Sequence, residues 1–174
     1  PVAPHFGGYH GILFPHFIEL YGQDHWALSI DALEKLTPFS SSEFAVRPFL
    51  QKQPKEMMKV MVKWSKHKNE HVRRLASEGC RPRLPWGMAL NYFKKDPSLI
   101  LPILENLKND PSEYVRRSVA NNLNDISKDN PDVLLNIASK WHGKSSNTDR
   151  LLKHAMRTML KKGNPSEYVT RVVF

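Results

Sequence analysis

Two segments of the chain repeat one another, and this repeat restricts the possible folds more than any other feature. Residues 69–79, NEHVRRLASEG, align with residues 112–122, SEYVRRSVANN, at a separation of about 43 residues. The motif PSEYV returns at residues 165–169, and a weaker echo, SSEFAVR, occupies residues 41–47. Helix-pair repeats of this length are typical of HEAT and armadillo-like proteins, whose stacked units bury a continuous core and present one concave face. The repeat therefore predicts an all-α fold, an α-solenoid of HEAT-like helical repeats.

Helix signals recur along the chain. An aspartate or asparagine that can cap a helix stands directly before a proline suited to the first helical turn at four places, Asp96-Pro97, Asp110-Pro111, Asn130-Pro131 and Asn164-Pro165. Apolar residues at helical spacing follow, and further amphipathic helices are predicted over 24–36 and 54–67. We interpret the large apolar residues of these two helices as core, namely Trp26, Met57, Met61 and Trp64.

Length and composition favour one domain, which we place at residues 1–174 because 40% of the residues are hydrophobic and can form a substantial core. The first residues, PVAPHFGGYHGILF, read like a chain that begins part-way, so we expect a shortened N-terminus. No apolar run approaches the roughly 18 residues that a membrane helix needs, and no signal peptide is visible. The single cysteine, Cys80, excludes an intramolecular disulfide and favours a reducing, cytoplasmic setting.

The charge balance indicates the class of partner. Lysine and arginine total 26 against 17 acidic residues, which gives a formal net charge of +9. Such an excess favours a polyanion, with nucleic acid the leading candidate, although a solvated basic surface without a specific role explains it equally well. The eight histidines show no paired ligand spacing, so no metal site is expected.

The stretch RRLASEGCRPRLPWG, residues 73–87, places Glu78 among four arginines and ahead of two prolines. Pro82 and Pro85 cannot continue a helix, so they predict a stiff connection that holds Arg81, Arg83 and Trp86 at fixed positions relative to Glu78. Such rigidity suits a site of preorganised groups. The alternative is a proline-rich corner with a buried tryptophan, which the residues alone favour modestly.

The repeat also predicts neighbours in space. Aligned positions of stacked units form a row of Glu78, Asn121 and Arg157, with Asp125 one helical turn beyond Asn121. Paired arginines occupy the same place in both units, at 73–74 and 116–117, three or four residues after Glu70 and Glu113. We expect one arginine of each pair to hold the repeats together by ion pairs. The other can face a phosphate.

On these residues the sequence resembles the DNA alkylation-repair glycosylases of the AlkC/AlkD superfamily, the AlkC branch most closely. The segment SEGCRPRLPW is diagnostic, and the resemblance runs through SSEFAVRPFL, VRRSVANNLNDISKDNPD and SNTDRLLKHAMRTMLKKGNP, from about Phe14 onward. It implies a monomeric solenoid whose concave basic groove holds duplex DNA with a positively charged base such as 3-methyladenine or 3-methylcytosine. It further implies base excision repair without a metal, an organic cofactor or insertion of the base into a protein pocket.

The resemblance assigns roles residue by residue. Glu78 is the first choice for the catalytic carboxylate beside the sugar, Glu43 and Asp125 support it, and Trp86 forms an aromatic wall. Contacts to phosphate or to the groove fall to Arg81, Arg83, Arg117, Asn121 and Arg157. A cationic base is already a good leaving group, so such an enzyme needs no general acid. Its carboxylates stabilise an oxocarbenium-like sugar and orient the attacking water.

Two alternatives stay open. One is a HEAT-like DNA-binding protein without catalysis, in which Glu78 and Asp125 only connect helices. The other is a protein-interaction scaffold whose basic face meets acidic partners. Three acids in a groove favour the glycosylase, since binding of phosphates alone gains nothing from carboxylates. We expect a cytoplasmic, nucleoid-associated enzyme.

Overall fold

The computed structural model describes residues 8–161, and every regular element in this range is helical. The elements are η2 (Gly8–Ile12), α1 (Leu13–Tyr21), α2 (Trp26–Leu36), α3 (Arg47–Lys52), α4 (Pro54–Trp64), α5 (Glu70–Glu78), α6 (Asn91–Lys95), α7 (Leu101–Leu107), α8 (Glu113–Ile126), α9 (Pro131–Trp141), α10 (Ser146–Ala155) and α11 (Arg157–Lys161). The prediction of an all-α chain is confirmed for these residues.

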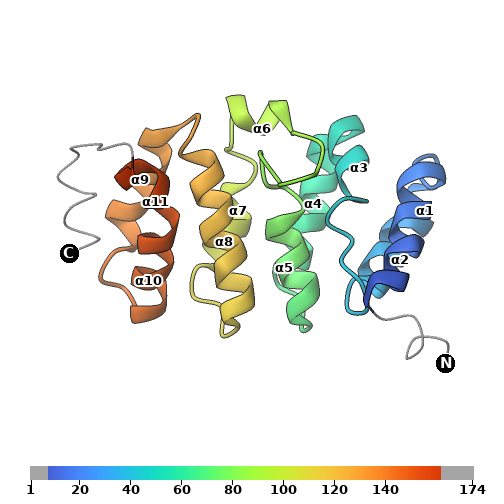
Figure 1. Cartoon of the computed structure of the whole chain (residues 1–174), viewed down its shortest axis with the longest axis horizontal. Helices are drawn as coiled ribbons and strands as arrows, with labels where there is room; N and C mark the ends of the chain where they lie inside the picture. Colours follow the sequence, from blue (N-terminus) through green and yellow to red (C-terminus); the bar gives the residue numbers. More distant parts are fainter. Residues whose placement is uncertain (1–7, 162–174) are drawn as a thin grey trace.

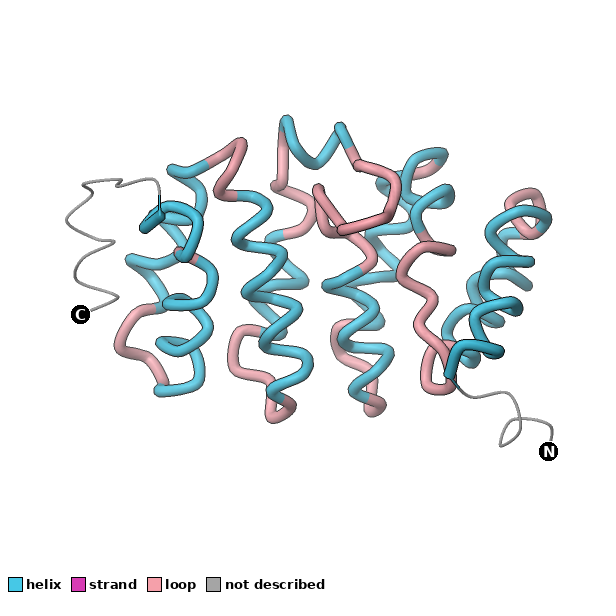
Figure 2. The backbone as a smooth tube through the Cα atoms, viewed as in Figure 1, coloured by secondary structure: helices cyan, strands magenta, loops and turns pink. Residues whose placement is uncertain are grey.

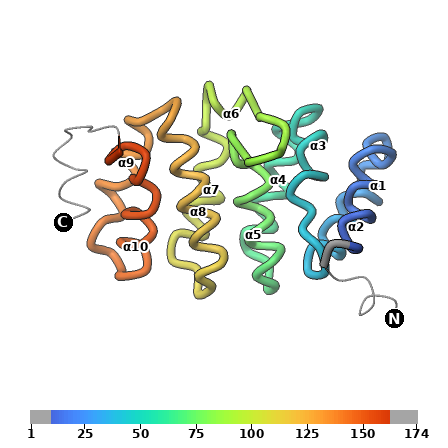
Figure 3. Tube along the Cα trace, in the orientation of Figure 1, coloured from blue at the N-terminus to red at the C-terminus, as the bar shows by residue number. Residues whose placement is uncertain are grey.

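The helices stand in two layers. Helices α5, α8 and α10 lie side by side in one layer, with α5 packed on α8 and α8 packed on α10 (Figure 1). Helices α4, α7 and α9 lie behind them, and most connections between the layers are short loops (Figure 2). The colour runs from blue to red along the long axis, so segments that follow one another in the chain also follow one another in space (Figure 3).

The helix starts follow the Asx-Pro signals to differing degrees. Helix α9 begins at Pro131, directly after Asn130. Helix α8 begins at Glu113, two residues beyond Pro111, and residues 98–100 form a turn before α7. The Asn164-Pro165 signal lies outside the described residues. Proline at the first turn thus marks the approach to a helix, and the first residue depends on the packing of the loop.

Three of the four residues predicted for the core lie in it, and the fourth, Trp26, is partly buried against it. Met57, Met61 and Trp64 are buried, and the Trp26 ring packs edge-on against Phe49 with 5.9 Å between ring centroids. The buried indole of Trp64 also donates Nε1–H to Oε2 of Glu34 at 2.5 Å. This bond satisfies the one polar atom of the indole.

Buried asparagines join the helices of the α5, α8 and α10 layer. Asn122 of α8 donates from Nδ2 to the backbone oxygen of Ser77 in α5 at 2.7 Å. Asn124 donates to the backbone oxygen of Ala155 at the end of α10 at 2.8 Å. Because each amide finds its acceptor on a neighbouring helix, these bonds set the relative height of the three helices.

One arginine of each predicted pair fastens a loop. Arg73 binds Asp110 through Nε and Oδ2 at 2.6 Å, and Arg116 donates to the backbone oxygens of Asp110 and Pro111 at 2.6 and 2.9 Å. Arg73 thus joins α5 to the loop between α7 and α8 by an ion pair, as expected for one arginine of the pair. The acid that pairs with Arg73 is Asp110 from the loop before α8, and Glu70, three residues earlier in α5, makes no ion pair with it.

Between residues 8 and 161, no helix combines the length and the apolar character needed to cross a membrane.

Candidate functional site

The loop between α5 and α6 presents Trp86 to solvent. Helix α5 ends at Glu78, as the prolines at 82 and 85 predict, and residues 79–90 form a loop without helical structure. Trp86 has a φ of 60°, and its side chain is 100% exposed. A left-handed backbone at a residue other than glycine costs about 1–2 kcal/mol, and an exposed indole gains nothing from burial. Both features are typical of a residue that meets a ligand.

Arg47 holds this loop in place. Its guanidinium is buried and donates to the backbone oxygens of Met88, Gly79 and Arg81, with 2.6 Å from Nε to the Met88 oxygen and 2.8 Å from Nη1 to the Gly79 oxygen. Burial lowers the pKa of Arg47 to about 10. One charged side chain therefore ties both ends of the Trp86 loop to α3.

Trp86 borders an open cleft of about 570 Å³ between the loop after α2, the side of α5 and the start of α8. Glu43 and Arg74 line this cleft together with Phe39, Phe44 and Tyr114. The cleft thus combines aromatic and apolar walls with one carboxylate and one guanidinium. It is large enough for a small-molecule group or a nucleoside.

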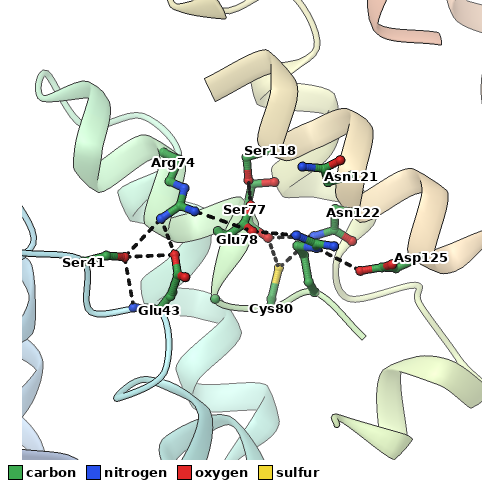
Figure 4. A network of polar contacts seen from close by, with 12 residues as sticks. Ser41, Glu43, Arg74, Ser77, Glu78, Cys80, Ser118, Asn121, Asn122 and Asp125 are labelled. Atoms are coloured by element: carbon green, nitrogen blue, oxygen red, sulfur yellow. Dashed lines mark hydrogen bonds and ion pairs between the residues drawn. The ribbon is translucent and has the colours of Figure 1, made fainter. Parts of the chain in front are cut away.

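Arg74 connects two of the predicted carboxylates. Its Nη1 donates to Oε2 of Glu43 and, at 3.0 Å, to the hydroxyl of Ser41, while Nη2 lies 3.5 Å from Oε1 of Glu78 (Figure 4). The guanidinium carbon also lies 5.2 Å from the centre of the Tyr114 ring. This cation-π contact fixes Arg74 beside the cleft.

Arg81 connects Glu78 to the third carboxylate. Its Nη1 donates to Oε1 of Glu78 at 2.6 Å, and its Nε donates to Oδ2 of Asp125 at 2.8 Å. The Ser118 hydroxyl donates to the other oxygen of Glu78 at 2.6 Å, and Lys128 donates to Asp125 at 2.9 Å. Glu43, Glu78 and Asp125 thus belong to one charge network carried by α5, α8 and the loop after α2.

This network gives Arg81 a different role from the predicted contact with phosphate. Burial alone would lower the pKa of Arg81, but the charges and hydrogen bonds of Glu78 and Asp125 outweigh it and raise that pKa. Arg81 is only 6% exposed, and its guanidinium faces these carboxylates instead of the solvent. The sequence places Arg81 among the phosphate contacts; in this structure it is a bridge between acids.

The other predicted contact residues have different surroundings. Arg83 pairs with Asp129 through Nη2 and Oδ1 at 2.6 Å, close to solvent. Arg157 donates to Oδ1 of Asn121 at 3.0 Å, so these members of the predicted row are neighbours. Arg117 borders a recess between α8 and α10.

Sequence reasoning missed Arg47, Arg74, Tyr114 and Ser118. For Arg74 a signal exists, because the repeat gives it the same position as Arg117. For Arg47 and Ser118 the partners lie 32 to 41 residues away in the sequence, and no local pattern indicates them.

The site offers acid and aromatic groups, and neither a metal centre nor a thiolate. In residues 8–161 no group of three or more His, Cys, Asp or Glu side chains could hold a metal ion. Burial raises the pKa of the Cys80 thiol to about 12, so this cysteine is a packing residue at neutral pH. What the cleft can do is stabilise positive charge near Trp86 through the Glu43 carboxylate, which Ser41 and Arg74 hold in place.

Known proteins resemble the chain over nearly its whole length. A profile of the DNA alkylation repair enzymes matches residues 30–159. A Bacillus subtilis (strain 168) protein, Uncharacterized protein YhaZ, is 59% identical over 162 residues, which are 93% of this chain and 45% of YhaZ. The structure of Pseudomonas fluorescens alkylpurine DNA glycosylase AlkC, bound to DNA containing an abasic site analog, matches with a TM-score of 0.92 and 43% identity over 98% of this chain and 47% of that one.

The chain therefore spans less than half the length of both relatives and shares the AlkC fold over that part. The resemblance read from SEGCRPRLPW and its flanking segments is confirmed. From the extent of the profile match and the identity to both relatives, it follows that the chain belongs to the DNA alkylation repair enzyme family.

Proposed function

We propose that the chain is a DNA glycosylase that hydrolyses the N-glycosidic bond of positively charged alkylated bases, such as 3-methyladenine and 3-methylcytosine, in duplex DNA. The observation that carries the proposal is the exposed indole of Trp86, held in a left-handed backbone beside the Glu43 carboxylate. An indole face and a nearby carboxylate both favour a sugar that gains positive charge in the transition state. The reaction begins base excision repair, and the base need not enter a protein pocket.

We infer that the helix pairs form a HEAT-like solenoid and that DNA lies along a basic groove on the α5, α8 and α10 layer. The repeat, the packing of α5 on α8 on α10, and the net charge of +9 support this arrangement. The Trp86 cleft opens beside α5 and α8 of the same layer. DNA on this layer would bring its sugar-phosphate backbone to Trp86.

The three carboxylates would have different roles in the reaction. Because an alkylated base carries positive charge, it leaves without protonation, and the enzyme has to stabilise the sugar cation and supply water. Glu43 lines the open cleft and is placed to contact a water there, while Glu78 and Asp125 lie deeper in the network. We assign Glu78 as the main source of negative potential at the sugar, with Asp125 fixing Arg81 and hence Glu78.

The proposal is tested by incubating the chain with duplex DNA that contains N-methylated adenine and cytosine and by separating the released bases chromatographically. We expect the wild type to release bases well above the spontaneous rate. Trp86→Ala should lower the rate of enzymatic release at least tenfold. DNA binding without release would favour the non-catalytic DNA-binding scaffold. Neither binding nor release would favour the protein-interaction scaffold.

A further inference from the structure

A second recess, separate from the Trp86 cleft, opens between α8 and α10. It has a volume of about 140 Å³. Arg116 and Arg117 from the start of α8 line it, together with Arg150 and His154 from α10. Glu113 is the one carboxylate among its lining residues. Three arginines and one acid therefore line the same recess, on the layer that also carries the cleft.

Two of these arginines have no acidic partner among the described residues. Arg116 is held by the backbone oxygens of Asp110 and Pro111. Arg117 and Arg150, by contrast, make no side-chain hydrogen bond or ion pair with the part of the chain that the structure describes. Unpaired arginines that line a common recess repel one another, so an anion between them would be stabilised.

The repeat makes the contrast sharper. Arg74 in α5 and Arg117 in α8 occupy the same position of their repeats. Arg74 is neutralised by Glu43 and Glu78, whereas no acid approaches the guanidinium of Arg117 closely enough for an ion pair in the described chain. The arginine at this repeat position is therefore paired within the internal network in α5, and in α8 its charge can bind an anion.

Further evidence for unbalanced positive charge comes from His154. Burial lowers the pKa of its imidazole, and the charges of Arg157 and Arg117 lower it further. The recess also borders the first turn of α8, where the helix dipole favours negative charge. At about 30 Å³ for each water molecule, its volume holds a few waters, which suits one tetrahedral oxyanion and is too small for a nucleoside.

We propose that the recess between α8 and α10 is a phosphate-binding site, in which Arg117 and Arg150 bind one phosphodiester of the DNA backbone with His154 beside them. The proposal rests on the proposed function, since it takes DNA as the polyanion. The site fixes the position of the duplex on the layer while Trp86 meets the sugar. It takes no part in the chemistry of base release.

The test uses a fluorescein-labelled duplex without a lesion and measures its affinity by anisotropy at several salt concentrations. Arg117→Gln and Arg150→Gln should each weaken binding about tenfold and reduce the salt slope by about one. Lys140→Gln, which removes one charge from exposed α9, is the matched control and should change affinity little. Glu113→Gln should tighten binding, because it removes the only acid lining the recess.

Base release by the wild type from methylated DNA separates this proposal from the proposed function. At limiting DNA, Arg117→Gln and Arg150→Gln should release bases more slowly in proportion to their weaker binding, because the recess holds the duplex. If both variants bind DNA like Lys140→Gln, the phosphate site is refuted while the glycosylase proposal stands. If the wild type fails to release bases but shows the predicted affinity changes, only the glycosylase proposal fails. No DNA binding by the wild type, or tighter binding of an RNA duplex of the same sequence, would overturn the DNA phosphate assignment.

Discussion

Arg81 donates a hydrogen bond from Nε to Oδ2 of Asp125 at 2.8 Å, although the two residues are 44 positions apart in the chain. The same guanidinium donates to Glu78 at 2.6 Å, and the exposed fractions of Glu78 and Asp125 are only 5% and 2%. Buried charges of this kind require their partners, since an unpaired buried ion is strongly destabilising. Arg81 is thus part of the rigid frame that joins α5 to α8.

Removal of Arg81 should therefore destabilise the fold. Arg81→Met leaves Glu78 and Asp125 buried without their shared partner, and we expect the free energy of unfolding to fall by about 3–5 kcal/mol. Arg83→Met is the matched control, because Arg83 pairs with Asp129 near the surface and should cost at most about 1 kcal/mol. Urea denaturation followed by circular dichroism measures both. Equal losses of unfolding free energy in the two variants would show that the buried ion pairs of Arg81 stabilise the fold no more than the surface pair of Arg83.

Glu78→Gln should separate catalysis from binding. The amide keeps the size of the side chain but removes the negative charge that would stabilise the sugar cation, so we expect base release to fall at least ~100-fold. Affinity for undamaged duplex should stay nearly unchanged. Glu56→Gln, which alters an exposed acid on α4, is the matched control and should keep full activity.

The Glu78 variant also needs a check of its fold, because Arg81 and Ser118 lose a charged partner. Thermal unfolding identifies the fraction folded at the assay temperature. A folded Glu78→Gln protein that releases bases at the wild-type rate would remove Glu78 from the mechanism.

Substitutions of Trp86 should affect the free energy of unfolding and base release differently. Its side chain is fully exposed, so Trp86→Ala should leave the free energy of unfolding almost unchanged. Trp86→Gly should stabilise the fold relative to Trp86→Ala by about 1 kcal/mol, because glycine adopts a φ of 60° without strain. Both variants should lose at least ~90% of base release, since neither retains the indole that would meet the sugar. A less stable glycine variant would mean that the backbone at this position is unstrained.

The sequence predicts features that arise from neighbouring residues. Pro131 starts α9 after its Asn130 signal, and the prolines after Glu78 end α5, because each effect acts within one helical turn. The repeat further aligns α5 with α8, and these two helices pack against each other. The all-α class was accessible for this reason, whereas the three carboxylates were assigned from the family resemblance.

Features set by distant contacts could not be predicted. The Trp86 loop is held by Arg47, whose acceptors on Gly79 and Met88 are 32 and 41 residues away. Arg81 looks like a phosphate ligand in the sequence, yet it is buried because α8 brings Asp125 to it. Equally, alignment of Arg74 with Arg117 cannot tell which of the two is neutralised, since Glu43 comes from a loop outside the aligned segments.

The lowered pKa of His154 makes DNA binding depend on pH. In the free protein, burial and the charges of Arg157 and Arg117 favour the neutral imidazole; Arg116 and Arg150 add positive charge to the same recess, and Glu113 is its one acid. A phosphate in the recess would raise the pKa of His154. Between the lowered and the raised pKa the bound protein then carries more protons than the free protein, so affinity should increase as the pH falls from about 7.5 to 5.5.

For each unit by which phosphate raises the pKa, the gain in affinity is at most about tenfold. Anisotropy titrations at constant ionic strength measure it, and His154→Gln should remove this part of the pH dependence. His142→Gln is the matched control, because His142 lies 3.4 Å from Asp149 at the end of α9, outside the recess, and this variant should keep the wild-type profile. The same affinity profile for His154→Gln and the wild type would show that no phosphate approaches His154, since a phosphate beside an imidazole must change its protonation.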